Sequence, residues 1–188
     1  MSKTKYLLIA LAFLLSGYLI GGNARADHIP LANGGFETGD ISGWTTFTTA
    51  QGQLGSGFPK VIDFDLTGAG LSKTAQFSVG RLSSNDTGAE GGGIYQTVNL
   101  AAGDYTISAG VGVAEFGSLF GAYNGGFFEL LLDEVLLDSY EFDGKTGPNE
   151  TRHKPLAALH VVSGGDHDIR IKITRPATPS STLAQLID

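Results

Sequence analysis

The sequence of 188 residues is rich in glycine, acidic and free of cysteine: it contains 28 Gly, no Cys, and 19 Asp and Glu against 12 Lys and Arg, for a formal net charge of −7. This length suits one domain whose core is large enough to be stable without disulfides, and the lack of Cys excludes thiol catalysis. Because negative charge repels phosphate backbones, we expect no nucleic-acid partner.

Residues 1–26 have the pattern of a secretory signal peptide. Lys3 and Lys5 precede an apolar run, and Ala24-Arg25-Ala26 places small residues where a signal peptidase cleaves. The apolar run is shorter than the roughly 20 residues that a membrane-spanning helix needs. We therefore expect cleavage before Asp27, secretion to an extracellular or periplasmic location, and no membrane attachment afterwards.

The mature chain, residues 27–188, is expected to form one domain that is more acidic than the full sequence. Three of the 12 basic residues and none of the 19 acidic ones lie in the leader, which leaves a formal net charge of −10. Such a surface favours neutral glycans or cations as partners over strongly anionic polysaccharides.

Two segments of the mature chain alternate between apolar and polar residues, which predicts half-buried strands. In residues 60–66 the apolar members are Ile62, Phe64 and Leu66, and the polar members are Asp63 and Asp65. In residues 169–173 the apolar members are Ile169, Ile171 and Ile173. Further strands are expected at residues 44–49, 75–80 and 155–162, which are rich in β-branched, aromatic or apolar residues.

Turn residues divide the chain into these strands. Residues 93–100 and 104–114 are expected to form a hairpin around Ala101-Ala102-Gly103, and Asp133-Glu134 is expected to turn residues 127–132 back into 135–140. Loops are expected at residues 51–59, 83–92, 117–126 and 143–154. No segment sustains a helical apolar stripe, so about nine or ten short strands predict an all-β, two-layer antiparallel β-sandwich.

The segment from Asn33 to Trp44, NGGFETGDISGW, combines glycine turns, one carboxylate and the only Trp. Glycines on both sides hold Phe36 and Glu37 in a short extended piece between two reversals. A glutamate at such a bend, with backbone carbonyls turned toward it, suits a hard cation such as calcium. The alternative is a solvated Glu beside a turn.

This segment resembles the opening of the carbohydrate-binding modules of families four and nine, which are galactose-binding-like jelly rolls. The resemblance continues at residues 93–100, 102–108 and 165–173, and it spans roughly residues 31 to 188. It implies that Trp44 packs in the core. It also implies a structural calcium bound by Glu37 and by Asp188, where the chain stops at the beginning of the family's last strand.

Catalytic motifs are absent from the sequence, which contains no G-x-S-x-G and no H-E-x-x-H. Carboxylates are abundant in an acidic chain, so no particular pair indicates glycosidase chemistry. We therefore predict no catalytic residues.

Sugar binding requires aromatic faces together with planar polar groups. The first candidates are Tyr123 and Asn124 with Phe120, in a glycine-rich stretch where a ligand can approach the backbone. The second candidates are Tyr95 and Gln96 on a central strand. The same stretches also contain Phe116, Phe127, Phe128 and Tyr140. For each aromatic residue the alternative is core packing.

These observations predict a secreted, non-catalytic domain that binds a polysaccharide or glycan, with a neutral one favoured, and carries a structural calcium. The first alternative is an extracellular matrix or adhesive surface domain that makes protein contacts. A third possibility is a jelly-roll polysaccharide hydrolase or lyase.

Overall fold

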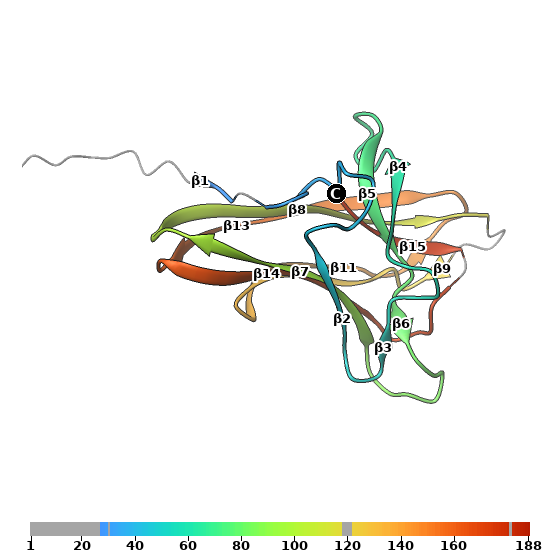
Figure 1. The fold of residues 1–188 in the computed structure, drawn as a ribbon. Coiled ribbons are helices and arrows are strands. Elements are labelled where there is room, and N and C mark those ends of the chain that lie inside the picture. Colours follow the sequence, from blue (N-terminus) through green and yellow to red (C-terminus); the bar gives the residue numbers. More distant parts are fainter. Residues whose placement is uncertain (1–26, 30, 118–121, 181) are drawn as a thin grey trace, which may run out of the picture.

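A computed structural model describes residues 27–29, 31–117, 122–180 and 182–188 (Figure 1), so the predicted leader lies outside the described residues. The described residues form strands and no helix, and none of them belongs to a helix that could cross a membrane. The strands are β1 (Asp27–His28), β2 (Thr45–Thr48), β3 (Gly52–Gln53), β4 (Lys60–Phe64), β5 (Ser72–Phe77), β6 (Gly80–Arg81), β7 (Glu90–Leu100), β8 (Gly103–Glu115), β9 (Ala122–Tyr123), β10 (Gly126–Leu132), β11 (Val135–Phe142), β12 (Lys145–Thr146), β13 (Thr151–Val162), β14 (Gly165–Arg175) and β15 (Leu183–Ile187).

Two sheets form the layers of a β-sandwich, as the sequence predicts (Figure 1). Sheet A has the order β1-β8-β15-β5-β4, and β13 pairs with the other edge of β8. Sheet B has the order β11-β10-β14-β7-β2. The pairings are antiparallel except that of β1 with β8, which is parallel. Two small two-stranded sheets, β12-β9 and β3-β6, complete the described fold.

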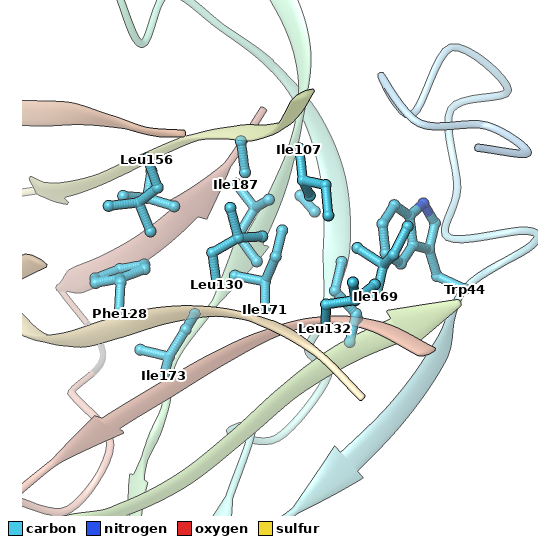
Figure 2. Packing of buried hydrophobic residues seen from close by; sticks show 14 of the residues in the cluster. Trp44, Ile107, Phe128, Leu130, Leu132, Leu156, Ile169, Ile171, Ile173 and Ile187 are labelled. Carbon is cyan, nitrogen blue, oxygen red and sulfur yellow. The ribbon is translucent and has the colours of Figure 1, made fainter. Parts of the chain in front are cut away.

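The core lies between the two sheets, and side chains from both layers point toward each other there (Figure 2). The predicted alternation of β14 is confirmed, since Ile169, Ile171 and Ile173 are all buried in this core. Trp44 is also buried in it, as the resemblance implies. The alternation of β4 is confirmed as well, but Ile62 and Phe64 pack on a separate small cluster around Leu66 rather than on the main core.

The predicted hairpin of residues 93–100 with 104–114 is wrong. β7 pairs with β14 and β2 in sheet B, whereas β8 pairs with β13, β15 and β1 in sheet A. The short connection through Ala101-Ala102 therefore crosses from one layer to the other instead of reversing the chain within one sheet. By contrast, the predicted turn at Asp133-Glu134 does join a hairpin, that of β10 and β11.

Several predicted boundaries also differ from the structure. The expected strand at residues 75–80 is divided between β5 and β6. The expected loops at residues 51–59, 117–126 and 143–154 contain the short strands β3, β9 and β12 and the start of β13, and β7 begins inside the expected loop 83–92.

His167 joins three segments at one end of sheet B. Its side chain is buried, its Nδ1 lies 2.7 Å from Asp133 Oδ2, and its Nε2 lies 2.7 Å from the carbonyl oxygen of Ser163. Asp133 also accepts a hydrogen bond of 2.8 Å from the backbone N–H of Asp168. The hydrogen bond with Asp133 and that with Ser163 raise the pKa of His167, because two acceptors favour the imidazolium with both nitrogens protonated.

Three consecutive glycines of β7 are required by close backbone contacts. A Cβ on Gly91 would lie 2.1 Å from the carbonyl oxygen of Ile173, and a Cβ on Gly93 would lie 1.9 Å from the carbonyl oxygen of Ile171. On the other side of β7, a Cβ on Gly92 would lie 2.1 Å from the carbonyl oxygen of Phe47. The neighbouring strands therefore approach β7 more closely than any side chain allows.

We predict that the protein becomes less stable as the pH rises above about 6.5, the ordinary value for His. Because the pKa of His167 is raised in the folded state, its stabilisation is complete below that pH and is lost as the pH rises through the folded-state pKa. Urea unfolding at a series of pH values measures this slope. The free energy of unfolding of the His167→Gln variant should be about 1–3 kcal/mol lower at pH 6, and it should depend less on pH. An unchanged pH dependence in this variant would contradict the assignment of the effect to His167.

Gly93→Ala should destabilise the fold by about 1–3 kcal/mol or more, because the backbone of β14 must move to accommodate the methyl group. Gly103→Ala is the matched control, since the nearest atom to its Cβ would be a ring carbon of Tyr105 at 3.7 Å, an ordinary contact. Thermal melts of both variants give the comparison. Equal midpoints for the two would show that the close approach is not a constraint.

Candidate functional site

The loop from Ala32 to Gly43 is fixed to β7 of sheet B by the amide of Gln96. Gln96 Oε1 accepts a hydrogen bond of 2.7 Å from the N–H of Ala32, and its Nε2 donates bonds of 2.9 Å to the carbonyls of Ala32 and Gly43. Gln96 is buried. Its amide therefore positions the loop and is not presented to a ligand, contrary to its selection as a binding residue.

Inside this loop, Asn33 supports the turns on both sides of Phe36. Its side-chain N–H group donates to the carbonyls of Asp40 and Ser42, each at 3.0 Å, and its backbone carbonyl accepts from Trp44 Nε1 at 3.0 Å. Phe36 is fully buried and its ring centroid lies 5.9 Å from that of Trp44. The loop is therefore held by the packing of Phe36 and Trp44 in the core and by the hydrogen bonds of Asn33.

The two predicted metal ligands lie in the loop from Ala32 to Gly43 and directly after β15. Glu37 is exposed, and its carboxylate lies beside Gly35: a Cβ added to Gly35 would be 3.5 Å from Glu37 Oε1. Asp188 follows β15, where its Oδ2 accepts a hydrogen bond of 3.0 Å from Ser72 Oγ and its backbone pairs with Gly110 in both directions. Gly35 and Asp188 line one shared cavity.

The donor set around Glu37 and Asp188 is small. Within the described part of the chain, no group of three or more His, Cys, Asp or Glu side chains could hold a metal ion. A calcium ion, which takes six to eight oxygen ligands, would therefore need backbone carbonyls and water in addition to Glu37 and Asp188.

An aromatic pair and a guanidinium lie together on the outer side of sheet B. Tyr95 of β7 pairs in register with Arg170 of β14, and Phe47 of β2 lies two residues along, opposite Gly93. The ring centroids of Phe47 and Tyr95 are 6.3 Å apart. The Cζ of Arg170 lies 4.7 Å from the Phe47 centroid and 5.2 Å from the Tyr95 centroid, which are cation–π distances.

Charged groups extend this surface across the sheet. Arg170 forms ion pairs with Glu134 at 2.5 Å and with Asp168 at 2.8 Å. Lys172, two residues along β14, pairs with Glu129 of β10 at 2.6 Å. We call this surface the aromatic face; it consists of Phe47, Tyr95, Arg170, Lys172, Glu129, Glu134 and Asp168.

Of the predicted ligand residues whose side chains the structure describes, Tyr95 lies on the aromatic face, and Gln96 and Asn124 do not. Tyr123 belongs to β9, which pairs with β12 and not with a strand of sheet B; the structure describes its backbone only. Phe120 lies outside the described residues. Asn124 follows β9 with a φ of 61°, and its Oδ1 is buried without a hydrogen-bond partner among the described residues.

The other aromatic residues of the predicted cluster do not form one surface. Phe128 is fully buried, whereas its neighbour Phe127 is half-buried on the outer side of β10. Phe116 is 42% exposed and contacts Phe64 at a centroid distance of 5.8 Å. Tyr140 packs against Phe142 at the core, with a centroid distance of 4.8 Å.

Sequence reasoning missed Phe47, Arg170 and Lys172. The alternation of residues 169–173 contained the signal, because it assigns both basic residues to the outer side of their strand. What the sequence lacks is the register that brings β2, β7 and β14 together.

No known family model and no curated protein matches the chain. Among solved structures, it is similar to a cyclase from Fischerella sp. TAU, with 16% identity and a TM-score of 0.50 over 84% of this chain and 92% of that chain. At this identity the likeness concerns the fold alone.

The chain is also similar to two carbohydrate-binding modules. One is the family 61 module TmCBM61, solved in complex with beta-1,4-galactotriose, with 17% identity and a TM-score of 0.46 over 84% of this chain and 92% of that chain. The other is a family 35 module from Clostridium thermocellum, with 13% identity and a TM-score of 0.36 over 78% of this chain and 93% of that chain. Neither belongs to family four or nine, so the resemblance to those two families stays a prediction.

Proposed function

We propose that the protein is a secreted, non-catalytic carbohydrate-binding domain whose binding surface is the aromatic face. The observation that carries the proposal is the grouping of Phe47, Tyr95 and Arg170 on the outer side of sheet B. Both rings are half-buried, so part of each remains open to solvent. Secretion rests on the leader pattern of residues 1–26.

The chemistry of the aromatic face suits a sugar. The C–H faces of a pyranose ring pack on aromatic rings, while carboxylates accept hydrogen bonds from its hydroxyls and a guanidinium or ammonium donates to them. On this face Tyr95 and Phe47 supply the rings, and Glu129 and Lys172 supply an acceptor and a donor 2.6 Å apart.

The charges on the aromatic face favour a neutral glycan. Arg170 and Lys172 are each already paired with carboxylates, and the face carries three carboxylates for its two cations. An anionic polysaccharide would have to displace these pairs against the negative charge of the whole chain.

A specific observation also favours a surface that makes protein contacts. Leu159 and Val161 are 68% and 70% exposed on β13, the edge strand of sheet A. Exposed apolar side chains on an unpaired edge are typical of adhesive contacts. This second candidate function uses the opposite layer from the aromatic face.

We further propose that Glu37 and Asp188, with backbone carbonyls of the loop from Ala32 to Gly43, hold a structural calcium. What supports this proposal is the family resemblance of the segment from Asn33 to Trp44, together with the cavity that Gly35 and Asp188 both line. A bound calcium would tie the loop to the end of β15.

Tyr95→Ala should weaken binding of a neutral glycan roughly tenfold or more, because it removes a stacking ring from the aromatic face. The measurement is calorimetric titration with soluble neutral glycans, after thermal melts have identified one that raises the midpoint. Phe116→Ala is the matched control, since Phe116 is an exposed aromatic residue on the other sheet. Equal weakening by both variants, or no effect of Tyr95→Ala, would exclude the aromatic face as the binding surface.

Calcium should raise the thermal midpoint, since a ligand that binds only the folded state stabilises it, by about 2.7 kcal/mol at 100 times its Kd. Glu37→Gln should abolish the shift. Glu141→Gln, which changes an exposed carboxylate on β11, should retain it. The calcium site would be refuted by identical shifts in all three proteins or by no shift in the unaltered one.

A further inference from the structure

Strand β13 has a free edge. It pairs with β8 in an uninterrupted antiparallel register from Thr151 to Val162, and none of the described strands pairs with its other edge. The backbone N–H of Ala157 donates a hydrogen bond of 2.9 Å to the side chain of Asp138 on β11, so it points away from β8. Because backbone groups alternate in direction along a strand, those of residues 159 and 161 also point to the free edge.

The two halves of this edge differ in their protection. Proteins blunt unpaired strand edges with proline, lysine, bulges or a covering segment, because such edges pair with other chains. Lys154 and Pro155 lie in the first half of β13, which β11 also contacts. The second half, residues 158–162, contains neither proline nor lysine, and its register has no bulge. Leu159 and Val161 instead expose about two thirds of their apolar side chains there, at 68% and 70%. We call residues 158–162 the free segment.

Three carboxylates border the free segment. Asp138 binds the backbone N–H at its start. Asp104 of β8 pairs in register with Val161, so both side chains lie on the same side of sheet A. The pKa of Asp133 is lowered by a backbone hydrogen bond from β14 and, more weakly, by the nearby His160 of the free segment. These groups make the edge attractive to cations.

The basic residues of β13 leave these carboxylates available. Arg152 and Lys154 lie in the first half of the strand, where their cations lie 5.6 Å from the Phe142 ring and 5.7 Å from the Tyr140 ring. The mature chain as a whole carries a formal net charge of −10, since three of the 12 basic residues lie in the leader. The field of the protein therefore also favours a cationic partner at this edge.

We propose that the free segment binds an extended peptide of another protein, in which Lys or Arg alternates with apolar residues, and that this peptide adds a strand to the edge of β13. Its backbone would pair with the N–H and C=O groups of Leu159 and Val161, and its apolar side chains would pack on theirs. Its cations would face the three carboxylates. The inference rests on the second candidate function, contacts with another protein, and is independent of glycan binding.

A second copy of the chain suits this edge less well than a basic peptide. Two copies joined through β13 would bring the same carboxylates together and would add the negative charges of both chains. For a basic peptide the same charges are attractive, and its affinity should fall as salt screens them.

The test uses the mature chain, residues 27–188, and three fluorescently labelled peptides. The probe has four Lys-Val repeats with both ends blocked. One control has four Glu-Val repeats, and the other is the Lys-Val peptide with every backbone nitrogen methylated, which cannot donate to a strand. Fluorescence anisotropy should show saturable binding of the probe and at least tenfold weaker binding of both controls.

Hydrogen exchange measured by NMR reports the pairing itself. The N–H groups of Leu159 and Val161 should exchange at least tenfold more slowly when the probe is bound. Those of Ala158 and His160 point to β8 and should change little.

Variants locate the binding surface. Leu159→Lys, which places a like charge on the exposed side of the edge, should weaken the probe at least tenfold. Leu71→Lys is the matched control, since Leu71 is 77% exposed between β4 and β5, and it should bind as the unaltered protein does. Asp104→Asn should weaken binding roughly two- to fivefold, as expected for one exposed ion pair.

Three results would overturn the proposal. The first is no saturable binding of the probe, or equal binding by the Leu159→Lys variant. The second is stronger binding of the Glu-Val peptide that Leu159→Lys abolishes, which would leave protein contacts standing and refute the basic partner. The third is a dimer in analytical ultracentrifugation that Leu159→Lys dissociates, together with slow exchange at Leu159 and Val161 without peptide, which would identify a second copy as the occupant.

Discussion

The fold depends on one buried amide. Gln96 lies on β7 of sheet B and bonds both ends of the loop from Ala32 to Gly43. A buried amide that lost these partners would be left unsatisfied at considerable cost. The loop brings Phe36 and Trp44 onto the core, and β2, which carries Phe47, begins directly after it. The core and the aromatic face therefore share this attachment point.

Strand β14 shows how one segment serves two purposes. Because successive side chains point to opposite sides of a sheet, Ile169, Ile171 and Ile173 form the interior while Arg170 and Lys172 stand on the outside. Burial of the three isoleucines holds β14 in place, and β14 therefore holds Arg170 and Lys172 at defined positions beside β7 and β10. A charged surface on a rigid strand needs little reordering when a ligand binds.

The sequence was sufficient where the information is local. The period-two alternation of β14 and the turn at Asp133-Glu134 were predicted from local residues, whereas the burial of Trp44 was implied by the family resemblance. The connection through Ala101-Ala102 was misread because a short turn can join two strands of one sheet or cross between two layers, and local residues do not distinguish these cases. The grouping of Phe47, Tyr95 and Arg170 depends on pairings between strands far apart in the chain, which no local pattern encodes.

The central claim is that a glycan binds across β2, β7 and β14. An NMR titration of the isotope-labelled protein with a bound neutral glycan tests it most directly, since each backbone amide reports on its own surroundings. The account predicts that the largest shifts fall on Phe47, Tyr95, Arg170 and their strand neighbours. Shifts centred instead on Asn124 and the β9–β12 pair, or on Leu159 and Val161 of β13, would contradict it.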